Sequence, residues 1–224
     1  MSLFPITGGC TDPTPAATIS FCDNAVGSLN ATASTLSSQD LGTATENRTI
    51  VVGVGWHNAV TISSVTVAGN TMTTPSGWSD ASDGSFNVGF REYDLSTGTS
   101  GDVVVTFSAN ASRMGIGVWA LYGVGASNDN DSHTYLESET ISTVQIMGGG
   151  VAIGYVVFHT PSSSTCTWTN MTTRFDDAIE TYTNDGGADT YSATTITPSI
   201  TADCPDAEGR RGQGPFSVIA WPKG

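Results

Sequence analysis

The sequence predicts an all-β fold: an antiparallel two-sheet sandwich, jelly-roll or immunoglobulin-like, with an extended N-terminal arm. Three observations carry this prediction. Apolar residues alternate along two valine-rich blocks, residues 48–69 and 101–125, which is the period-2 pattern of strands with one face towards a core. Glycine occurs 26 times in 224 residues, as many short strands joined by tight turns require. Helical periodicity is almost absent.

Each valine-rich block divides into two strands. In the first, apolar alternation predicts strands over residues 48–56 and 60–68, and the change of parity at Ser63-Ser64 predicts a β-bulge. In the second, a polar stretch over residues 108–112 separates strands 102–108 and 112–122. This pattern predicts a β-hairpin with a loop of about five residues.

The rest of the chain contains further strand candidates. Residues 151–158 are apolar on both parities, which predicts a central strand covered on both faces. Residues 174–181 form the best helix candidate, at most two turns long, whereas polar residues 123–147 and 183–213 predict long surface loops. The other expected strands are 86–94, 150–159, 165–172, 190–196 and 214–221.

Composition along the chain predicts two parts. Residues 1–40 contain three prolines, several glycines and Ser/Thr/Ala runs, and only residues 17–22 read as a strand. We expect this segment to be an arm that packs on its own domain or reaches a neighbour, and residues 41–224 to form the β-sandwich domain. No short-period repeat is found, although the two valine-rich blocks share a strand-turn-strand pattern.

The formal net charge of −14 comes from 21 acidic and 7 basic residues, and the only lysine is Lys223. Direct nucleic-acid binding is therefore not expected, because phosphate contacts need a basic stripe. The acidic surface provides solubility, or it faces outward on a particle or towards a basic partner. No secretory leader is expected, because the start MSLFPITGGC has no basic region followed by an apolar stretch. No membrane-spanning segment is expected, because no stretch approaches the roughly 20 apolar residues that a span needs.

Four cysteines lack the CxxC spacing of a zinc ribbon or a thioredoxin-like motif. Three disulfide connectivities remain open. A Cys10–Cys22 bond would close a loop in the arm, and free buried thiols are equally compatible with a reducing cytosol. The cysteines are Cys10, Cys22, Cys166 and Cys204.

Residues that could carry chemistry are scattered. The histidines have no HxH or HExxH spacing, and no GxSxG motif occurs. A β-scaffold glycosidase would need a pair of carboxylates, but nothing distinguishes one pair among the glutamates. The histidines are His57, His133 and His159, and the candidate glutamates are Glu46, Glu92, Glu137, Glu139 and Glu180. The sequence therefore assigns no catalytic residue, no cofactor and no metal ligand.

Two further patterns have a binding interpretation and a structural one. Acidic segments 80–84 and 128–132 carry the oxygen ligands that calcium prefers, but they lack EF-hand spacing, so Asx-type turns are favoured. Exposed tryptophans could form a sugar-stacking platform. Four of the five lie in expected strands and are expected in the core, which leaves Trp78 as the loop exception.

The run RTIVVGVGWHNAVTISSVTVAGNTMT, with the later segment LSTGTSGDVVVTFSANASRMGIGVWALYGV, resembles β-sandwich structural proteins of tailed bacteriophages. The likeness covers residues 47–160, with a weaker likeness over 167–183. The resemblance implies an oligomeric virion component that is not an enzyme: a capsid decoration protein, a head fibre or a tail fibre.

The leading hypothesis is a virion protein, assembled in the host cytoplasm, that decorates the capsid by docking on the lattice of the major capsid protein. The expected partners are that protein or other virion proteins, further copies of this chain and a host-surface glycan, with no nucleic acid and no membrane. The alternatives are a tail-fibre or receptor-binding module and a carbohydrate-binding module.

Overall fold

The computed structural model describes residues 16–28, 30–133, 140–159, 165–180, 183–205 and 213–224. Within these ranges every helix or strand assigned is a β-strand, which confirms the all-β prediction. The strands form four antiparallel sheets that pack against one another as in a β-sandwich.

The first half of the chain builds two of the sheets. A five-stranded sheet has the order β1-β9-β3-β7-β6, and a four-stranded sheet has the order β2-β8-β4-β5. The bounds are β1 Thr18–Val26, β2 Ala31–Asp40, β3 Arg48–His57, β4 Ile62–Val67, β5 Asn70–Thr71, β6 Ala81–Ser82, β7 Phe86–Asp94, β8 Ser100–Ala111 and β9 Arg113–Tyr122.

The second half builds the other two. A five-stranded sheet has the order β10-β16-β11-β14-β13, and β12 pairs with β15. The bounds are β10 Asp129–His133, β11 Gly150–His159, β12 Thr167–Thr169, β13 Thr172–Glu180, β14 Thr183–Ser192, β15 Thr201–Asp203 and β16 Phe216–Trp221.

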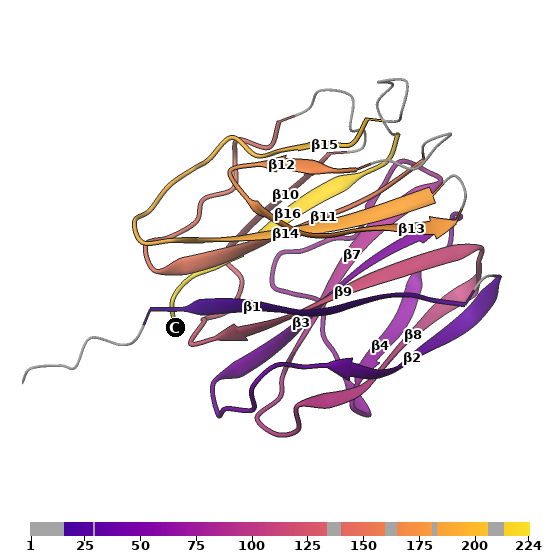
Figure 1. The fold of residues 1–224 in the computed structure, drawn as a ribbon, viewed down its shortest axis with the longest axis horizontal. Coiled ribbons are helices and arrows are strands. Elements are labelled where there is room, and N and C mark those ends of the chain that lie inside the picture. The colour runs from indigo at the N-terminus through magenta and orange to yellow at the C-terminus, as the bar shows by residue number, and fades with distance from the viewer. Residues whose placement is uncertain (1–15, 29, 134–139, 160–164, 181–182, 206–212) are drawn as a thin grey trace, which may run out of the picture.

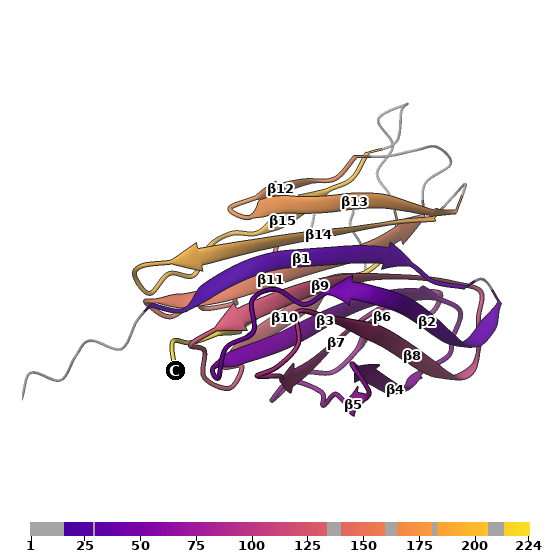
Figure 2. The same cartoon turned by 60° about the horizontal axis from the view of Figure 1, so that its bottom comes forward.

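The sheets form a stack of layers. Figures 1 and 2 show β2, β4 and β8 on one side of the molecule and β12 and β15 on the opposite side. One apolar core lies between the two sheets of the first half, a second lies inside the second half, and a third lies between the two five-stranded sheets. Both five-stranded sheets are therefore covered on two faces, and β11 is buried at nine of its ten positions, as its sequence predicts.

The two halves have the same topology. In each five-stranded sheet the first strand of the half pairs with the last (β1 with β9, β10 with β16), and the last pairs with a strand that is central in the sheet, β3 or β11. In the first sheet β3 then pairs with β7, and β7 with β6. In the second sheet β11 pairs in the same way with β14, and β14 with β13. The chain thus contains a long-period structural repeat that no short-period sequence pattern signals.

The outer layers correspond as well. Residues 141–146 come after β10 in the chain, just as β2 comes after β1. The two ends of this segment form the isolated antiparallel bridges Ile141–Ile200 and Ile146–Ile196. The segment 196–200 leads directly into β15, which pairs with β12 as β8 pairs with β4. Each half is therefore a sandwich of its own, and the two sandwiches meet through their five-stranded sheets.

Glycines shape the face where the two sandwiches meet. A Cβ atom on Gly53 would lie 2.6 Å from Cδ2 of Tyr155, and one on Gly55 would lie 2.9 Å from Cε1 of the same ring. Tyr155 stands on β11 of the opposite sheet and is fully buried. The absence of a side chain at Gly53 and Gly55 creates the space that this ring fills, since interiors are packed without room for an extra methyl group.

A buried arginine fixes the start of β3. The Arg48 guanidinium donates five hydrogen bonds of 2.7–3.0 Å to backbone carbonyls of residues 41, 42, 95, 97 and 98. All five of its donors are thus satisfied inside the protein. Arg48 joins the chain entering β3 to the loop between β7 and β8.

Several strand predictions are confirmed and others are corrected. Strands 86–94 and 150–159 have the expected bounds, and the pairing of β4 with β8 shifts between Ile62 and Ser64, where the bulge was expected. The expected hairpin between β8 and β9 is wrong, because β8 pairs with β2 and β4 while β9 pairs with β1 and β3. The chain turns a corner at Ser112 because β9 is buried on both faces and β8 is not.

The helix prediction for residues 174–181 is wrong, because Thr172–Glu180 form β13. Phe175 and Ile179 are four residues apart, and this spacing puts two side chains on the same face both in a helix and in a strand. The backbone pairing with β14 favours the strand. The loop prediction for 183–213 fails at β14, whose polar side chains are hydrogen-bonded in the interior.

Two strands come from the segment expected to be an arm. Residues 18–26 form β1 at an edge of the first five-stranded sheet, and residues 31–40 form β2 in the outer sheet. These residues belong to the first sandwich. Residues 1–15, the remainder of the expected arm before β1, lie outside the described residues.

Gly53→Ala is expected to destabilise the protein by about 1–3 kcal/mol, because the new methyl group would overlap the buried ring of Tyr155. The free energy of urea unfolding measures the effect. Gly186→Ala is the matched control, since its Cβ would meet its nearest neighbour at an ordinary 3.4 Å. Equal stability of the two variants would contradict the packing described for this face.

Candidate functional site

Two indole–carboxylate hydrogen bonds cross between the sandwiches. The Nε1–H of Trp119 on β9 donates to Oδ2 of Asp189 on β14 at 3.1 Å, and the Nε1–H of Trp221 on β16 donates to Oε2 of Glu92 on β7 at 2.7 Å. β9 corresponds to β16 and β14 to β7, so the two bonds are reciprocal, as in a two-fold interface between identical chains. Both carboxylates also line hollows at the seam between the sandwiches.

The first hollow is an acidic groove of about 480 Å³ at the start of β3 and the end of β7. Glu92 and Asp94 are two residues apart on β7, so their side chains project from the same face. Thr49 donates a hydrogen bond of 2.6 Å to Asp94. Burial raises the pKa of Glu92, and the charge of Asp94 acts in the same direction, while the hydrogen bond from Trp221 opposes the rise.

An adjoining hollow of about 310 Å³ shares Thr49, Asp94 and Val124 with this groove and adds Glu46. Of the five glutamates that the sequence offers as carboxylate candidates, Glu92 lines the groove and Glu46 lines the adjoining hollow. Glu180 lies elsewhere, paired with Arg113. Glu137 and Glu139 lie outside the described residues.

The second seam hollow, the Tyr191 pocket, has a volume of about 490 Å³. It lies between the start of β1 and strands β13 and β14, and is lined by residues 16–19, 172, 174 and 189–191. Arg174 donates from Nε and Nη2 to the two oxygens of Asp189 at 2.8 and 2.7 Å. This pocket thus contains a neutralised carboxylate beside an exposed aromatic ring, whereas the groove contains carboxylates without an arginine.

A buried carboxyl group lies deeper between the sheets. Asp185 on β14 accepts a hydrogen bond from the hydroxyl of Tyr155 and is 1 % exposed. Burial raises its pKa well above the ordinary value, and the negative charges of Asp177 and Asp176 act in the same direction. The sequence carries no signal for this group, because the polar residues of β14 predict a loop.

The histidines do not converge on a metal site. His57 and His159 each contact the ring of Phe86, at centroid distances of 4.8 and 6.2 Å, and His133 stacks on Phe216. Burial and the nearby Arg113 lower the pKa of His57. Among the described residues no group of three His, Cys, Asp or Glu side chains could hold a metal ion.

All five tryptophans are in the interior, which confirms the prediction for the four in strands and corrects the one for Trp78. Trp78 is 7 % exposed, packs edge-on against Phe90 and donates to Asp80 at 3.2 Å. A tryptophan sugar platform is therefore excluded, because no indole ring presents a face to solvent. Among the residues that the structure describes, the exposed aromatic ring at a hollow is that of Tyr191.

The acidic segments serve local structure. Asp80 forms a bidentate ion pair with Arg91, and Asp83 accepts hydrogen bonds from the backbone of residues 85 and 86. Asp129 and Asp131 each accept from the backbone N–H of the following residue. In the first segment these contacts are those of an ion pair and an Asx-type turn, as favoured from the sequence, whereas the second segment forms β10.

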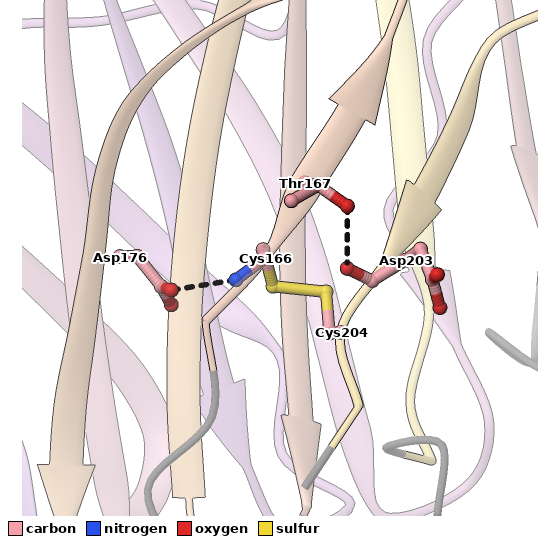
Figure 3. Close-up of a disulfide and its surroundings, with 5 residues drawn as sticks. All are labelled: Cys166, Thr167, Asp176, Asp203 and Cys204. Atoms are coloured by element: carbon pink, nitrogen blue, oxygen red, sulfur yellow. Dashed lines mark hydrogen bonds between the residues drawn. A yellow bond between two sulfur atoms is a disulfide. The ribbon is translucent and has the colours of Figure 1, made fainter. Parts of the chain in front are cut away.

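Cys166 and Cys204 form a disulfide next to the β12–β15 pair (Figure 3). The N–H of Cys166 donates to Asp176 on β13, and the Thr167 hydroxyl donates to the backbone carbonyl of Asp203. In the first sandwich the corresponding strands are β4 and β8, and the corresponding position lies one residue beyond their Ile62–Phe107 pair. There Thr61 and Ser108 are joined by hydrogen bonds instead of a disulfide. The disulfide thus fastens a sheet of two three-residue strands.

Cys22 has a free thiol. Burial and the charge of Asp40 raise its pKa to about 11, so the reactive thiolate is scarce at neutral pH. Cys10, the partner considered for it, lies outside the described residues.

Comparisons with protein-family models, with curated proteins and with solved structures find no match to this chain. Among the described residues, no helix is long and apolar enough to cross a membrane.

Replacing both Cys166 and Cys204 by Ala is expected to lower the free energy of unfolding by about 3–4 kcal/mol, because the bond closes a loop with a sequence separation of 38. Urea unfolding without reductant measures this loss. Cys22→Ala is the control and is expected to change stability by less than about 1 kcal/mol. A double variant as stable as the wild type would show that the disulfide carries no stability.

The pH dependence of stability tests the buried Asp185. Because its pKa is raised in the folded state, the folded protein holds this proton more tightly than the unfolded chain does. The stabilisation is complete below the ordinary aspartate pKa of about 3.9 and is lost as the pH rises through the raised value. In Asp185→Asn, urea unfolding from about pH 4 upwards is expected to show a smaller loss of stability with rising pH.

Asp102→Asn serves as the control for this measurement, because Asp102 is exposed on β8. It is expected to keep the wild-type slope. An unchanged slope in Asp185→Asn would contradict the raised pKa of that buried carboxyl group.

Proposed function

We propose that this protein is a structural component of a tailed-phage particle, which decorates the capsid by docking on the lattice of the major capsid protein. The role is one of binding and assembly rather than catalysis. The particle is assembled in the host cytoplasm, and the other expected partners are virion proteins and further copies of this chain. The resemblance of residues 47–160 to phage β-sandwich proteins supports the proposal.

The layered packing is the observation that supports it best. Both five-stranded sheets are covered on two faces, and the described apolar side chains form three internal cores. Among the described residues, only Val26, Met147, Tyr191 and Ile196 are large exposed hydrophobic side chains. A rigid body with a polar, acidic outer surface suits a component that stands on a particle and contacts it through a limited area.

The edge of β1 is the contact that we propose. β1 has nine residues and ends its sheet, so its outer edge pairs with no described strand. The other nine-residue edge, β13, has two register shifts and carries acidic residues, features that discourage strand addition. β1 has one register shift and can add a strand from a partner, which provides backbone hydrogen bonds without an apolar patch.

Mass spectrometry of purified particles tests this role. The protein is expected at a copy number that scales with the major capsid protein, and an abundant host cytosolic protein measured in the same sample is the control for carry-over. Its absence from the particles would contradict the proposal. In electron microscopy of antibody-labelled particles we expect label on the head, whereas label at the tail tip would select the receptor-binding alternative.

A further inference from the structure

We propose that the Tyr191 pocket binds a neutral pyranose sugar, with the tyrosine ring stacking on the sugar and Arg174 donating to its hydroxyl groups. The pocket lies at the seam between the sandwiches, and the inference does not depend on the particle role. It rests on four properties of the described residues: an exposed aromatic ring, a fixed donor, hydroxyl-bearing walls and local neutrality.

The aromatic ring comes first. Tyr191 is 45 % exposed, whereas the tryptophans are 0–8 % exposed and the other tyrosines that the structure describes, Tyr93, Tyr122 and Tyr155, are at least partly buried. It is two residues from Asp189 on β14, so both side chains project from the face that looks towards β1. An exposed ring beside polar groups offers an apolar surface for the C–H face of a sugar and a hydroxyl group at its rim.

Arg174 supplies a donor that is already fixed. Two of its nitrogens bind Asp189, which is 1 % exposed and also accepts the hydrogen bond from Trp119. In this planar fork the remaining N–H groups point away from the carboxylate. The Arg174 side chain is 35 % exposed, so these groups can reach a ligand with little further loss of side-chain entropy.

The walls and the charge define the class of ligand. Thr18 and Thr172 line the pocket and carry hydroxyl groups, which both donate and accept, as sugar hydroxyls do. The volume of about 490 Å³ lies within the usual range for small-molecule sites. Arg174 and Asp189 cancel in charge, and the protein as a whole carries −14. A neutral sugar is therefore favoured over an anionic one.

The pocket differs from the corresponding feature of the first sandwich. There the Arg91–Asp80 ion pair joins β7, which corresponds to β14, to the start of the edge strand β6, which corresponds to β13. Asp80 also accepts a hydrogen bond from the indole of Trp78. Trp78 is buried over it, and Ser127 donates to the carbonyl of Ser76 beside it. The ion pair is thus covered in one half and open beside an exposed ring in the other.

Saturation-transfer NMR and calorimetric titration of the full chain with methyl glycosides of glucose, galactose, mannose and N-acetylglucosamine test the inference. We expect at least one glycoside to bind, with a Kd in about the millimolar range. Tyr191→Ala is expected to weaken binding by about tenfold or more, while Tyr191→Phe stays within about twofold because the stacking face is retained.

Arg174→Lys is expected to weaken binding by about fivefold or more, since a lysine loses the planar fork but keeps the charge beside Asp189 and so preserves the fold. Val26→Ala, at the other end of β1, is the control and is expected to bind like the wild type. Binding by none of the four glycosides, binding unaffected by Tyr191→Ala, or tighter binding of methyl glucuronide would each overturn the inference.

Discussion

The packing of one five-stranded sheet on the other is the constraint on which the rest of the structure depends. Each sandwich presents a face that is too apolar to be left in water, and the opposite sandwich covers it. Glycines on β3 make room for Tyr155, and the reciprocal bonds of Trp119 and Trp221 satisfy carboxylates that the same packing buries. Shape and polarity therefore fix a single alignment of the halves.

This alignment also places the hollows. Because the repeated strands are equivalent while their side chains are not, the seam has an acidic groove around Glu92 in one half and a neutral pocket around Arg174 and Tyr191 in the other. Side-chain differences between two sandwiches of the same topology can thus create different hollows without disturbing either core. The same asymmetry gives one outer sheet a disulfide where the other has hydrogen bonds.

The fold class and the strongest strands are predictable from the sequence, because alternation and two-faced hydrophobicity report directly on burial, as in β7 and β11. The placement of β14 is not, since Asp185 and Asp189 look solvent-exposed until their partners on other strands are known. The structural repeat is not visible in the sequence for a related reason: the two halves share their strand order, but the residues at corresponding positions differ. Of the groups at the hollows, the sequence offers Glu46 and Glu92 among several equal candidates, whereas Tyr191 carries no local signal.

Differential scanning calorimetry of the oxidised full chain tests the central claim, that the two sandwiches form one structure through their shared interface. Separating them would expose the buried faces of both sheets, so neither half is expected to unfold alone. The account predicts a single transition whose calorimetric enthalpy equals its van't Hoff enthalpy. Two resolved transitions, each with the enthalpy of about half the chain, would contradict it.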